Sequence, residues 1–149
     1  TDFLFYVLSD IQQIQGTKPK GMLLQHHKIY PFDTMPIMQK ARKENKAVFV
    51  DCYTSWCGPC KMMSSKVFPD KQAGDFFNPR FISLKIDMEK GEGKELAQKW
   101  NISAFPTYLI LNPQGEVVYT SRGYIPVEEL IKRMNEGLEQ WKNNIKTGK

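Results

Sequence analysis

The sequence predicts an α/β fold with three layers, in which helices cover both faces of a central mixed sheet. Two observations carry this prediction. Segments with the spacing of strands and of helices alternate in the first part of the chain, which favours parallel strands joined by crossover helices. The turn signal Asn-Pro-Gln-Gly at residues 112–115 then joins two neighbouring segments into an antiparallel hairpin, so the sheet is expected to be mixed.

The composition is that of one globular domain. The chain has 149 residues, of which 41% are hydrophobic and 25% charged, and a chain of this length can bury a core without disulfide staples. The apolar run at residues 3–8 is much shorter than the ~20 residues of a membrane-spanning helix. The net charge of +5 is spread along the chain, with a local excess at the C-terminal end, which predicts a solvated basic tail and no nucleic-acid partner.

Residues 1–33 are interpreted as a partly structured N-terminal extension, and residues 34–149 as a domain that ends in the basic tail. Residues 1–21 are expected to be weakly structured because residues 16–21 resemble a linker, whereas residues 23–30 are expected to form a short strand. The early apolar stretch lacks the basic region and the small-residue cleavage site of a signal peptide. It is therefore either the remnant of a leader or an extension.

The first helix of the domain is expected over residues 31–44. Asp33 or Thr34 can cap this helix, and Pro36 suits its first turn. One face of the helix carries Met35, Met38 and Ala41. The nearly continuous apolar run at residues 47–53 then predicts a central strand that is covered on both faces, where its single carboxylate is out of place.

Four further helices and three further strands complete the prediction. Three of the helices are expected at residues 57–68, 70–77 and within 91–100, and the strands at residues 81–87, 107–111 and 116–120. The helix within 91–100 carries Leu96, Ala97 and Trp100 on one side. The last helix starts near Pro126, and its apolar positions recur with the spacing of one buried helical face. These positions are Val127, Leu130, Ile131, Met134, Leu138 and Trp141.

The most informative segment of the chain reads Trp56-Cys57-Gly58-Pro59-Cys60-Lys61. It places two thiols three residues apart, where a buried strand gives way to a helix. At a helix start, Cys57 faces unpaired backbone N–H groups and the positive end of the helix dipole, and both favour the reactive thiolate. Cys60 lies one turn further on, within reach of Cys57. Cys57 can therefore attack a substrate disulfide, and Cys60 can resolve the mixed disulfide that forms.

The alternative to redox chemistry is a zinc site. Such a site would need two more ligands, for which Cys52, His26 and His27 are the candidates, so we expect no metal. The two histidines are interpreted as surface residues. Alternation along the strand points Cys52 away from Asp51, which predicts a buried, inert thiol, with a regulatory thiol as the alternative.

Residues 50–61 resemble the active-site strand and helix of the thioredoxin family. The resemblance continues through Ile86-Asp87, through Ile-Ser-Ala-Phe-Pro-Thr at residues 102–107 and to Gly123, and it covers roughly residues 34–141. Residues 49–63 and 88–91 look most like exported thioredoxin-like proteins of bacteria. The resemblance implies the thioredoxin fold and no cofactor, the redox group being a Cys57–Cys60 disulfide.

The resemblance also implies roles for individual residues. Cys57 matches the nucleophile, Cys60 matches the resolving cysteine, and Asp51 matches a buried carboxylate that exchanges a proton with the resolving thiol. Pro106 matches a cis-proline whose loop lies beside the disulfide and pairs with substrate backbone. The other expected substrate-binding residues are Trp56, Gly58, Pro59, Phe105 and Gly123.

One departure from the family concerns the partner of Asp51. The family often has a buried lysine four residues before the position of Asp87, and this chain has Ser83 there. Lys85 lies on the same strand face, but we do not expect it to replace that lysine. Without a cationic partner, desolvation is expected to raise the pKa of Asp51.

Together, these motifs predict a thiol–disulfide oxidoreductase that reduces protein disulfides, since Gly58-Pro59 resembles the dipeptide of the reducing family members. The alternatives are a disulfide isomerase or an electron relay in the cell envelope, and a thioredoxin-like binding module with little turnover. The expected partners are protein disulfides and an upstream electron donor, either a thioredoxin reductase or a membrane thiol–disulfide transporter, and the protein is expected to be a monomer. An exported, periplasmic location is expected, with the cytoplasm as the alternative.

Overall fold

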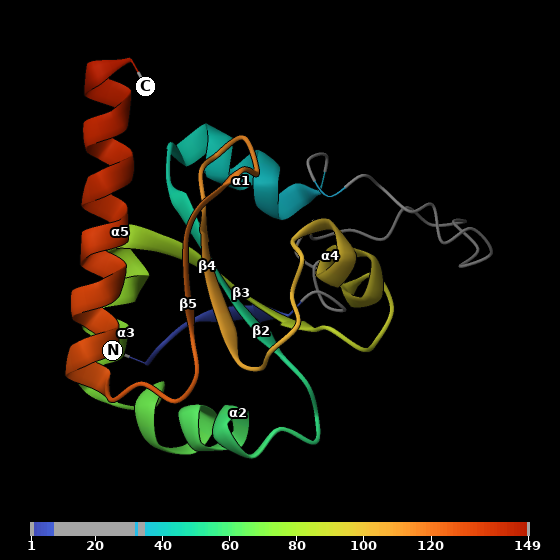
Figure 1. Cartoon of the computed structure of the whole chain (residues 1–149). Coiled ribbons are helices and arrows are strands. Elements are labelled where there is room, and N and C mark those ends of the chain that lie inside the picture. The colour runs from blue at the N-terminus through green and yellow to red at the C-terminus, as the bar shows by residue number, and fades with distance from the viewer. Residues whose placement is uncertain (1, 8–31, 33–34, 149) are drawn as a thin grey trace, which may run out of the picture.

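The computed structural model describes residues 2–7, 32 and 35–148. Its centre is a five-stranded sheet with the strand order β1-β3-β2-β4-β5 (Figure 1). The strands are β1 (Phe5–Val7), β2 (Ala47–Tyr53), β3 (Phe81–Asp87), β4 (Thr107–Leu111) and β5 (Val117–Arg122). β3 pairs in parallel with β1 and β2, whereas β4 pairs antiparallel with β2 and β5. The predicted mixed sheet is therefore confirmed, and β2, β3 and β4 have the predicted bounds.

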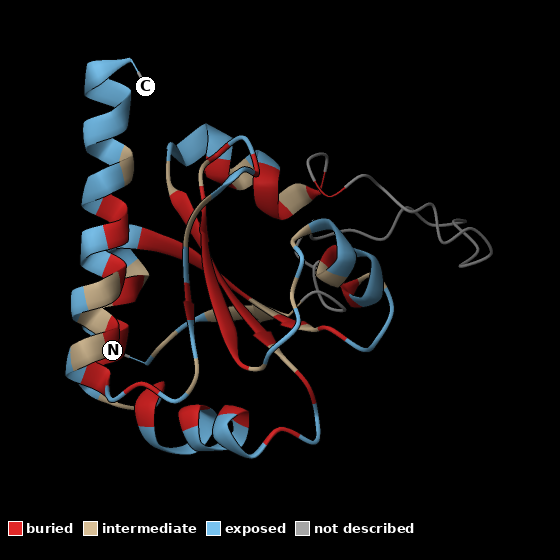
Figure 2. Ribbon diagram, in the orientation of Figure 1, coloured by how far each residue is buried: buried red, intermediate tan, exposed pale blue. Residues whose placement is uncertain are grey.

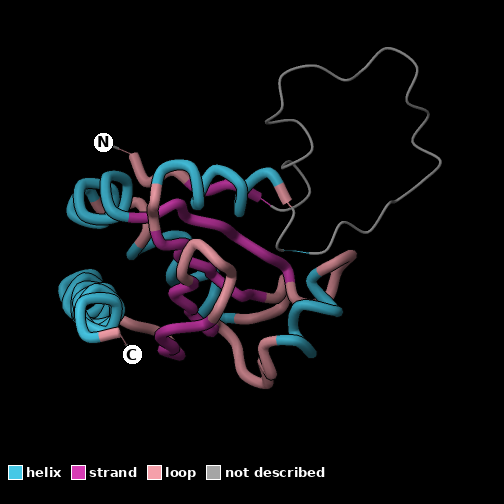
Figure 3. Tube along the Cα trace, turned by 90° about the horizontal axis from the view of Figure 1, so that it is seen from above, coloured by secondary structure: helices cyan, strands magenta, loops and turns pink. Residues whose placement is uncertain are grey.

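Helices cover both faces of this sheet, as the alternating segments predict. They are α1 (Pro36–Glu44), α2 (Gly58–Met62), the π-helical turn η3 (Met63–Val67), α3 (Lys71–Arg80), α4 (Gly93–Lys99) and α5 (Val127–Thr147). α1 and α4 share one core with the sheet, and η3, α3 and α5 share the other. Figure 3 shows the strands between α3 and α5 on one side and α4 on the other. No helix among the described residues has the length and apolar character needed to span a bilayer.

The side chains of β2 alternate between these two cores. Val48, Val50 and Cys52 face the core of α1 and α4, whereas Ala47 and Phe49 face the core of η3, α3 and α5. All these residues are buried, so the central strand runs through the interior of the molecule (Figure 2). This is the environment that a nearly continuous apolar run requires.

The N-terminal residues differ from the prediction. Phe5–Val7 forms the edge strand of the sheet, in parallel register with residues 83–85 of β3. The rings of Phe3 and Phe5 stack with their centroids 4.2 Å apart, and both pack against Phe68. The expectation that residues 1–21 are weakly structured is therefore wrong for this strand, because three residues are too few to show a period. The strand expected at residues 23–30 lies outside the described residues.

Two helix boundaries also differ from the prediction. α1 begins at Pro36 instead of residue 31, with Met35 as its N-cap and no cap from the Met35 side chain. The expected capping residues Asp33 and Thr34 lie outside the described part of the chain. Pro36 lies in the first turn, as predicted. The helix expected at residues 57–68 consists of α2 followed by η3, which changes the spacing of its side chains.

Candidate active site

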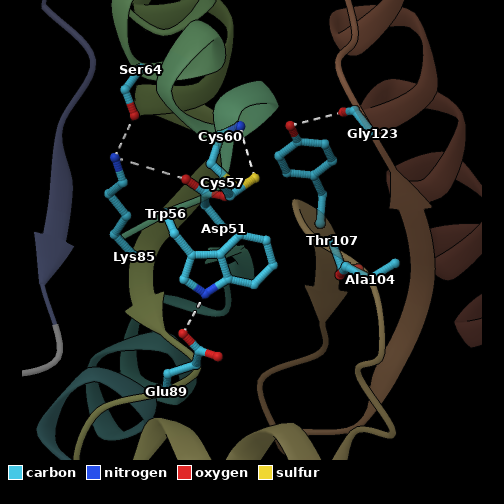
Figure 4. Close-up of a disulfide and its surroundings, with 11 residues drawn as sticks. Asp51, Trp56, Cys57, Cys60, Ser64, Lys85, Glu89, Ala104, Thr107 and Gly123 are labelled. Atoms are coloured by element: carbon cyan, nitrogen blue, oxygen red, sulfur yellow. Dashed lines mark hydrogen bonds and ion pairs between the residues drawn. A yellow bond between two sulfur atoms is a disulfide. The ribbon is translucent and has the colours of Figure 1, made fainter. Parts of the chain in front are cut away.

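The two cysteines of the Cys-Gly-Pro-Cys segment lie where β2 leads into α2. Cys57 is the N-cap of α2, and its Sγ accepts a hydrogen bond of 3.1 Å from the backbone N–H of Cys60. Pro59 lies in the first turn, where its missing N–H leaves no bond unmade. A disulfide joins Cys57 to Cys60, with their Cα atoms 5.2 Å apart (Figure 4). The backbone donor that holds the Cys57 sulfur would also favour its thiolate after reduction.

The surface beside the disulfide contains an exposed indole. Trp56 is 63% exposed, whereas Cys57 is 3% and Cys60 6% exposed. The indole Nε1–H donates a 2.6 Å hydrogen bond to Oε1 of Glu89, and the ring meets Phe105 edge-on with centroids 6.0 Å apart. Little of either cysteine therefore reaches the surface, whereas the neighbouring indole is exposed.

The loop that carries Pro106 is tied to the end of β5. The Phe105–Pro106 peptide bond is cis, as predicted. The Gly123 N–H donates to the Pro106 carbonyl at 3.0 Å, and the Tyr108 hydroxyl donates to the Gly123 carbonyl at 3.1 Å. Gly123 has a φ of +86°, a left-handed conformation that favours glycine. The structure thus brings Phe105, Pro106 and Gly123 together, and Phe105 touches Trp56.

Asp51 lies on β2 and is 2% exposed. Its Oδ1 has no hydrogen-bond partner among the described residues. Burial raises the pKa of this carboxyl to about 7, against the opposing effect of the nearby Lys85 ammonium. A carboxyl with that pKa can both accept and release a proton near neutral pH.

Lys85 does reach Asp51, so the expectation that Asp51 lacks a cationic partner is wrong. In the parallel pairing of β2 with β3, Lys85 stands directly beside Asp51, whereas Ser83 stands beside Phe49. The Lys85 Nζ lies 4.0 Å from Oδ2 of Asp51. The register of β2 and β3 brings Lys85 and Asp51 together, and this register cannot be predicted from the local sequence of either strand.

Three other residues of the site were not identified from the sequence. They are Ser64, which accepts a 2.7 Å hydrogen bond from Lys85, Glu89, which holds Trp56, and Tyr108, which stands beside Asp51 on β4. Alternation along β4 could have placed Tyr108 on the face of Asp51. No signal pointed to Ser64, because the π-helical turn shifts it relative to α-helical spacing.

Cys52 is a free, fully buried thiol on the opposite face of β2 from Asp51. Burial raises its pKa, and the charge of Asp51 adds to this effect. The predicted buried position is confirmed, and the raised pKa is that of an inert thiol. His26 and His27 lie outside the described residues, and within the described part no group of three His, Cys, Asp or Glu side chains is placed to hold a metal ion.

Comparison with known proteins agrees with this geometry. Residues 36–138 match the family described as "Thioredoxin-like domain". The chain is 36% identical over 99 residues to a thioredoxin of Bacillus subtilis, and the aligned region covers 66% of this chain and 88% of that protein. It is 36% identical over 97 residues to an H-type thioredoxin of Oryza sativa, and the aligned region covers 65% of this chain and 73% of that protein. It also resembles the solution structure of a proposed disulphide isomerase from Bacteroides thetaiotaomicron, with 48% identity and a TM-score of 0.62, over 69% of this chain and 85% of that one.

Proposed function

The chain belongs to the thioredoxin-like family and is a protein-disulfide oxidoreductase, and we propose that its physiological reaction is the reduction of disulfides in other proteins. The thioredoxin fold that the sequence predicts is confirmed by the same match. The observation that carries the proposal is the Cys57–Cys60 disulfide at the start of α2, with the Cys60 N–H directed at the Cys57 sulfur.

The proposed reaction has two exchange steps. The Cys57 thiolate attacks one sulfur of the substrate disulfide, the substrate S–S bond breaks, and one substrate thiolate leaves. The Cys60 thiol then gives its proton to the Asp51 carboxylate and attacks the Cys57 sulfur, which releases the second substrate thiolate. Two electrons pass from the dithiol to the substrate, and Cys57–Cys60 becomes the disulfide. A dithiol donor, either a thioredoxin reductase or a membrane thiol–disulfide transporter, restores the reduced form by the reverse exchange.

Substrate contacts are proposed for the surface around the sulfurs. Trp56 and Phe105 offer apolar area beside the disulfide. Gly58 leaves space, because a Cβ placed there would meet no other part of the protein within 4 Å apart from its chain neighbours and its own helix backbone. The Pro106 loop, held by Gly123, offers backbone for pairing with an extended substrate segment. Pro59 completes the rim at the first turn of α2.

The reaction is tested by reduction of insulin disulfides with dithiothreitol, followed as turbidity. Cys57→Ser should abolish the acceleration, because no nucleophile remains. Cys60→Ser should accumulate mixed disulfides with the substrate, visible on a non-reducing gel, because the resolving thiol is absent. Undiminished turnover by the Cys57→Ser variant would contradict the mechanism.

The second candidate is a disulfide isomerase, favoured by the similarity to the Bacteroides thetaiotaomicron protein. Refolding of scrambled ribonuclease distinguishes the two, since an isomerase restores activity without net reduction. A reduction potential close to that of thioredoxin, about −270 mV, supports the reductase, and a value near −180 mV supports the isomerase. A binding module would hold its partners equally well with both cysteines replaced by serine.

The proposed location is the bacterial periplasm, where the protein would relay electrons from a membrane donor to exported proteins. The similarity of residues 49–63 to exported bacterial relatives supports this location. Fractionation of the native cells tests it, and recovery of the protein with cytoplasmic markers would favour a thioredoxin reductase as the donor.

A further inference from the structure

The ammonium group of Lys85 is held between two acceptors on different elements. Its Nζ donates a 2.7 Å hydrogen bond to Oγ of Ser64 on η3, and it lies 4.0 Å from Oδ2 of Asp51 on β2 (Figure 4). Three aromatic rings lie alongside it, with centroids 5.0 Å away for Tyr53, 5.6 Å for Phe5 and 5.9 Å for Phe68. The 2.7 Å distance to Ser64 is that of a charge-assisted hydrogen bond, whereas the 4.0 Å distance to Asp51 is too long for one.

We propose that Ser64 is a positioning residue for Asp51, because its hydroxyl holds the Lys85 ammonium at a distance where it attracts the carboxylate without bonding to it directly. The proposal deepens the proposed function, since it rests on Asp51 as the group that exchanges a proton with Cys60. A direct ion pair would favour the carboxylate and weaken it as a proton acceptor. The restraint by Ser64 keeps Asp51 able to change protonation state near neutral pH.

Ser64 is well placed for this restraint because its backbone is fixed. It lies in the π-helical turn η3, whose first and last residues, Met63 and Val67, are buried in the core that η3 shares with α3 and α5. The buried neighbours hold the backbone of Ser64 in place, so that its exposed hydroxyl is presented to Lys85 from the side of η3. π-Helical turns are frequent at functional sites, and here the turn presents a hydroxyl to β3.

The Asp51 carboxylate is one acceptor that a released Lys85 ammonium could reach. Oδ1 of Asp51 is buried and has no hydrogen-bond partner among the described residues, which is a costly state for an ionised group. The competing destination is a cavity of about 300 Å³ beside Lys85, which is also lined by Phe5 and Asp2. The test below separates these two destinations.

Lys85 is the charge whose movement Asp51 would feel. The other titratable groups near Asp51 are Tyr53 and Cys52 on β2 and Tyr108 on β4, and burial raises the pKa of all three, so that they stay neutral at neutral pH. Cys57 and Cys60 do not titrate while they form the disulfide. A change at Ser64 in the oxidised protein therefore reaches Asp51 through Lys85.

The test is Ser64→Ala in the oxidised full-length chain, with the pKa of the Asp51 carboxyl measured by carbon-13 NMR titration. The pKa should fall by about 1, because the ammonium closes on the carboxylate. Ser65→Ala is the matched control, since the Ser65 hydroxyl donates to the Met62 carbonyl instead of contacting Lys85, and this variant should leave the pKa unchanged. Ser64→Thr retains the hydroxyl and should restore the wild-type value.

A double-mutant cycle shows whether Ser64 acts through Lys85. In a Lys85→Met background, Ser64→Ala should no longer shift the pKa, whereas a merely structural effect of Ser64 would persist. A pKa that stays constant in Ser64→Ala, or one that rises because the ammonium moves into the cavity, would overturn the proposal. The titration needs no turnover, so an inactive wild-type protein in the insulin assay would count against the proposed function alone.

Discussion

Asp51→Asn should remove most of the pH dependence that one buried carboxyl imposes on the stability of the oxidised protein. In the folded chain, burial raises the pKa of Asp51 from 3.8 to about 7. Between these two values the folded state holds a proton that the unfolded state has released. The stabilisation is therefore fully present below the unfolded value and is lost as the pH rises through the folded one.

The size of this effect follows from the two pKa values. Each pKa unit corresponds to 1.36 kcal/mol, so the gap between 3.8 and about 7 amounts to about 4 kcal/mol of unfolding free energy. The wild type loses this amount between about pH 4 and pH 8, at up to about 1.4 kcal/mol per pH unit. An asparagine cannot ionise, so the unfolding free energy of the variant does not decrease in this way with pH. Any constant effect of the substitution cancels when the two ends of the pH range are compared.

The assay is urea unfolding of both proteins from pH 4 to pH 8, followed by tryptophan fluorescence without reductant so that Cys57–Cys60 stays oxidised. The variant should gain about 4 kcal/mol relative to the wild type across that range. Glu129→Gln is the contrasting control, because a hydrogen bond from Arg133 lowers the pKa of Glu129 and gives its contribution the opposite sign. A stability difference between Asp51→Asn and wild type that stays constant with pH would refute the raised pKa of Asp51. It would also refute the proposed role of Asp51 as the proton acceptor for Cys60.

Three further predictions concern packing and reactivity. Cys52 should not react with Ellman's reagent in the folded, oxidised protein and should react once in urea, because it is fully buried and its pKa is raised; a fast native reaction would contradict the buried position. Gly93→Ala should lower the unfolding free energy by about 1–3 kcal/mol, because its Cβ would overlap the Asp87 carbonyl, whereas Gly58→Ala, which meets nothing within 4 Å, should change it far less. Phe49→Ala should cost about 3–5 kcal/mol in urea unfolding, since the ring is fully buried among other rings, and a loss below about 1 kcal/mol would contradict that packing.

The parts of the fold that the sequence predicts correctly are those with a local signal. The apolar run of β2, the alternation of β3 and the spacing in α5 each follow from which side chains must be buried, and the structure has them where predicted. β1 carries no such signal, because its three residues join the sheet through pairing with a strand some 80 positions away. Pairing across such a separation is a property of the whole chain and not of the segment.

The site divides in the same way. Cys57 and Cys60 are three residues apart, so one helical turn suffices to bring them together, and the motif alone predicts their contact. Lys85 and Ser64 come from other elements, and their contacts depend on the register of β3 and on the π-helical turn. The sequence could place Lys85 on the correct face of its strand, but not at the correct height beside Asp51.

This division suggests that the two parts of the site can vary independently. A lysine that shifts by two residues along β3 remains on the same face, because side chains alternate with a period of two. The family's frequent lysine position is occupied here by Ser83, which stands beside Phe49, whereas Lys85 stands directly beside Asp51. The Cys57–Cys60 segment is untouched by that move. In the proposed mechanism, the motif sets which bonds are exchanged, and the register of β2 and β3 sets how strongly the Lys85 cation acts on Asp51, the proposed proton acceptor.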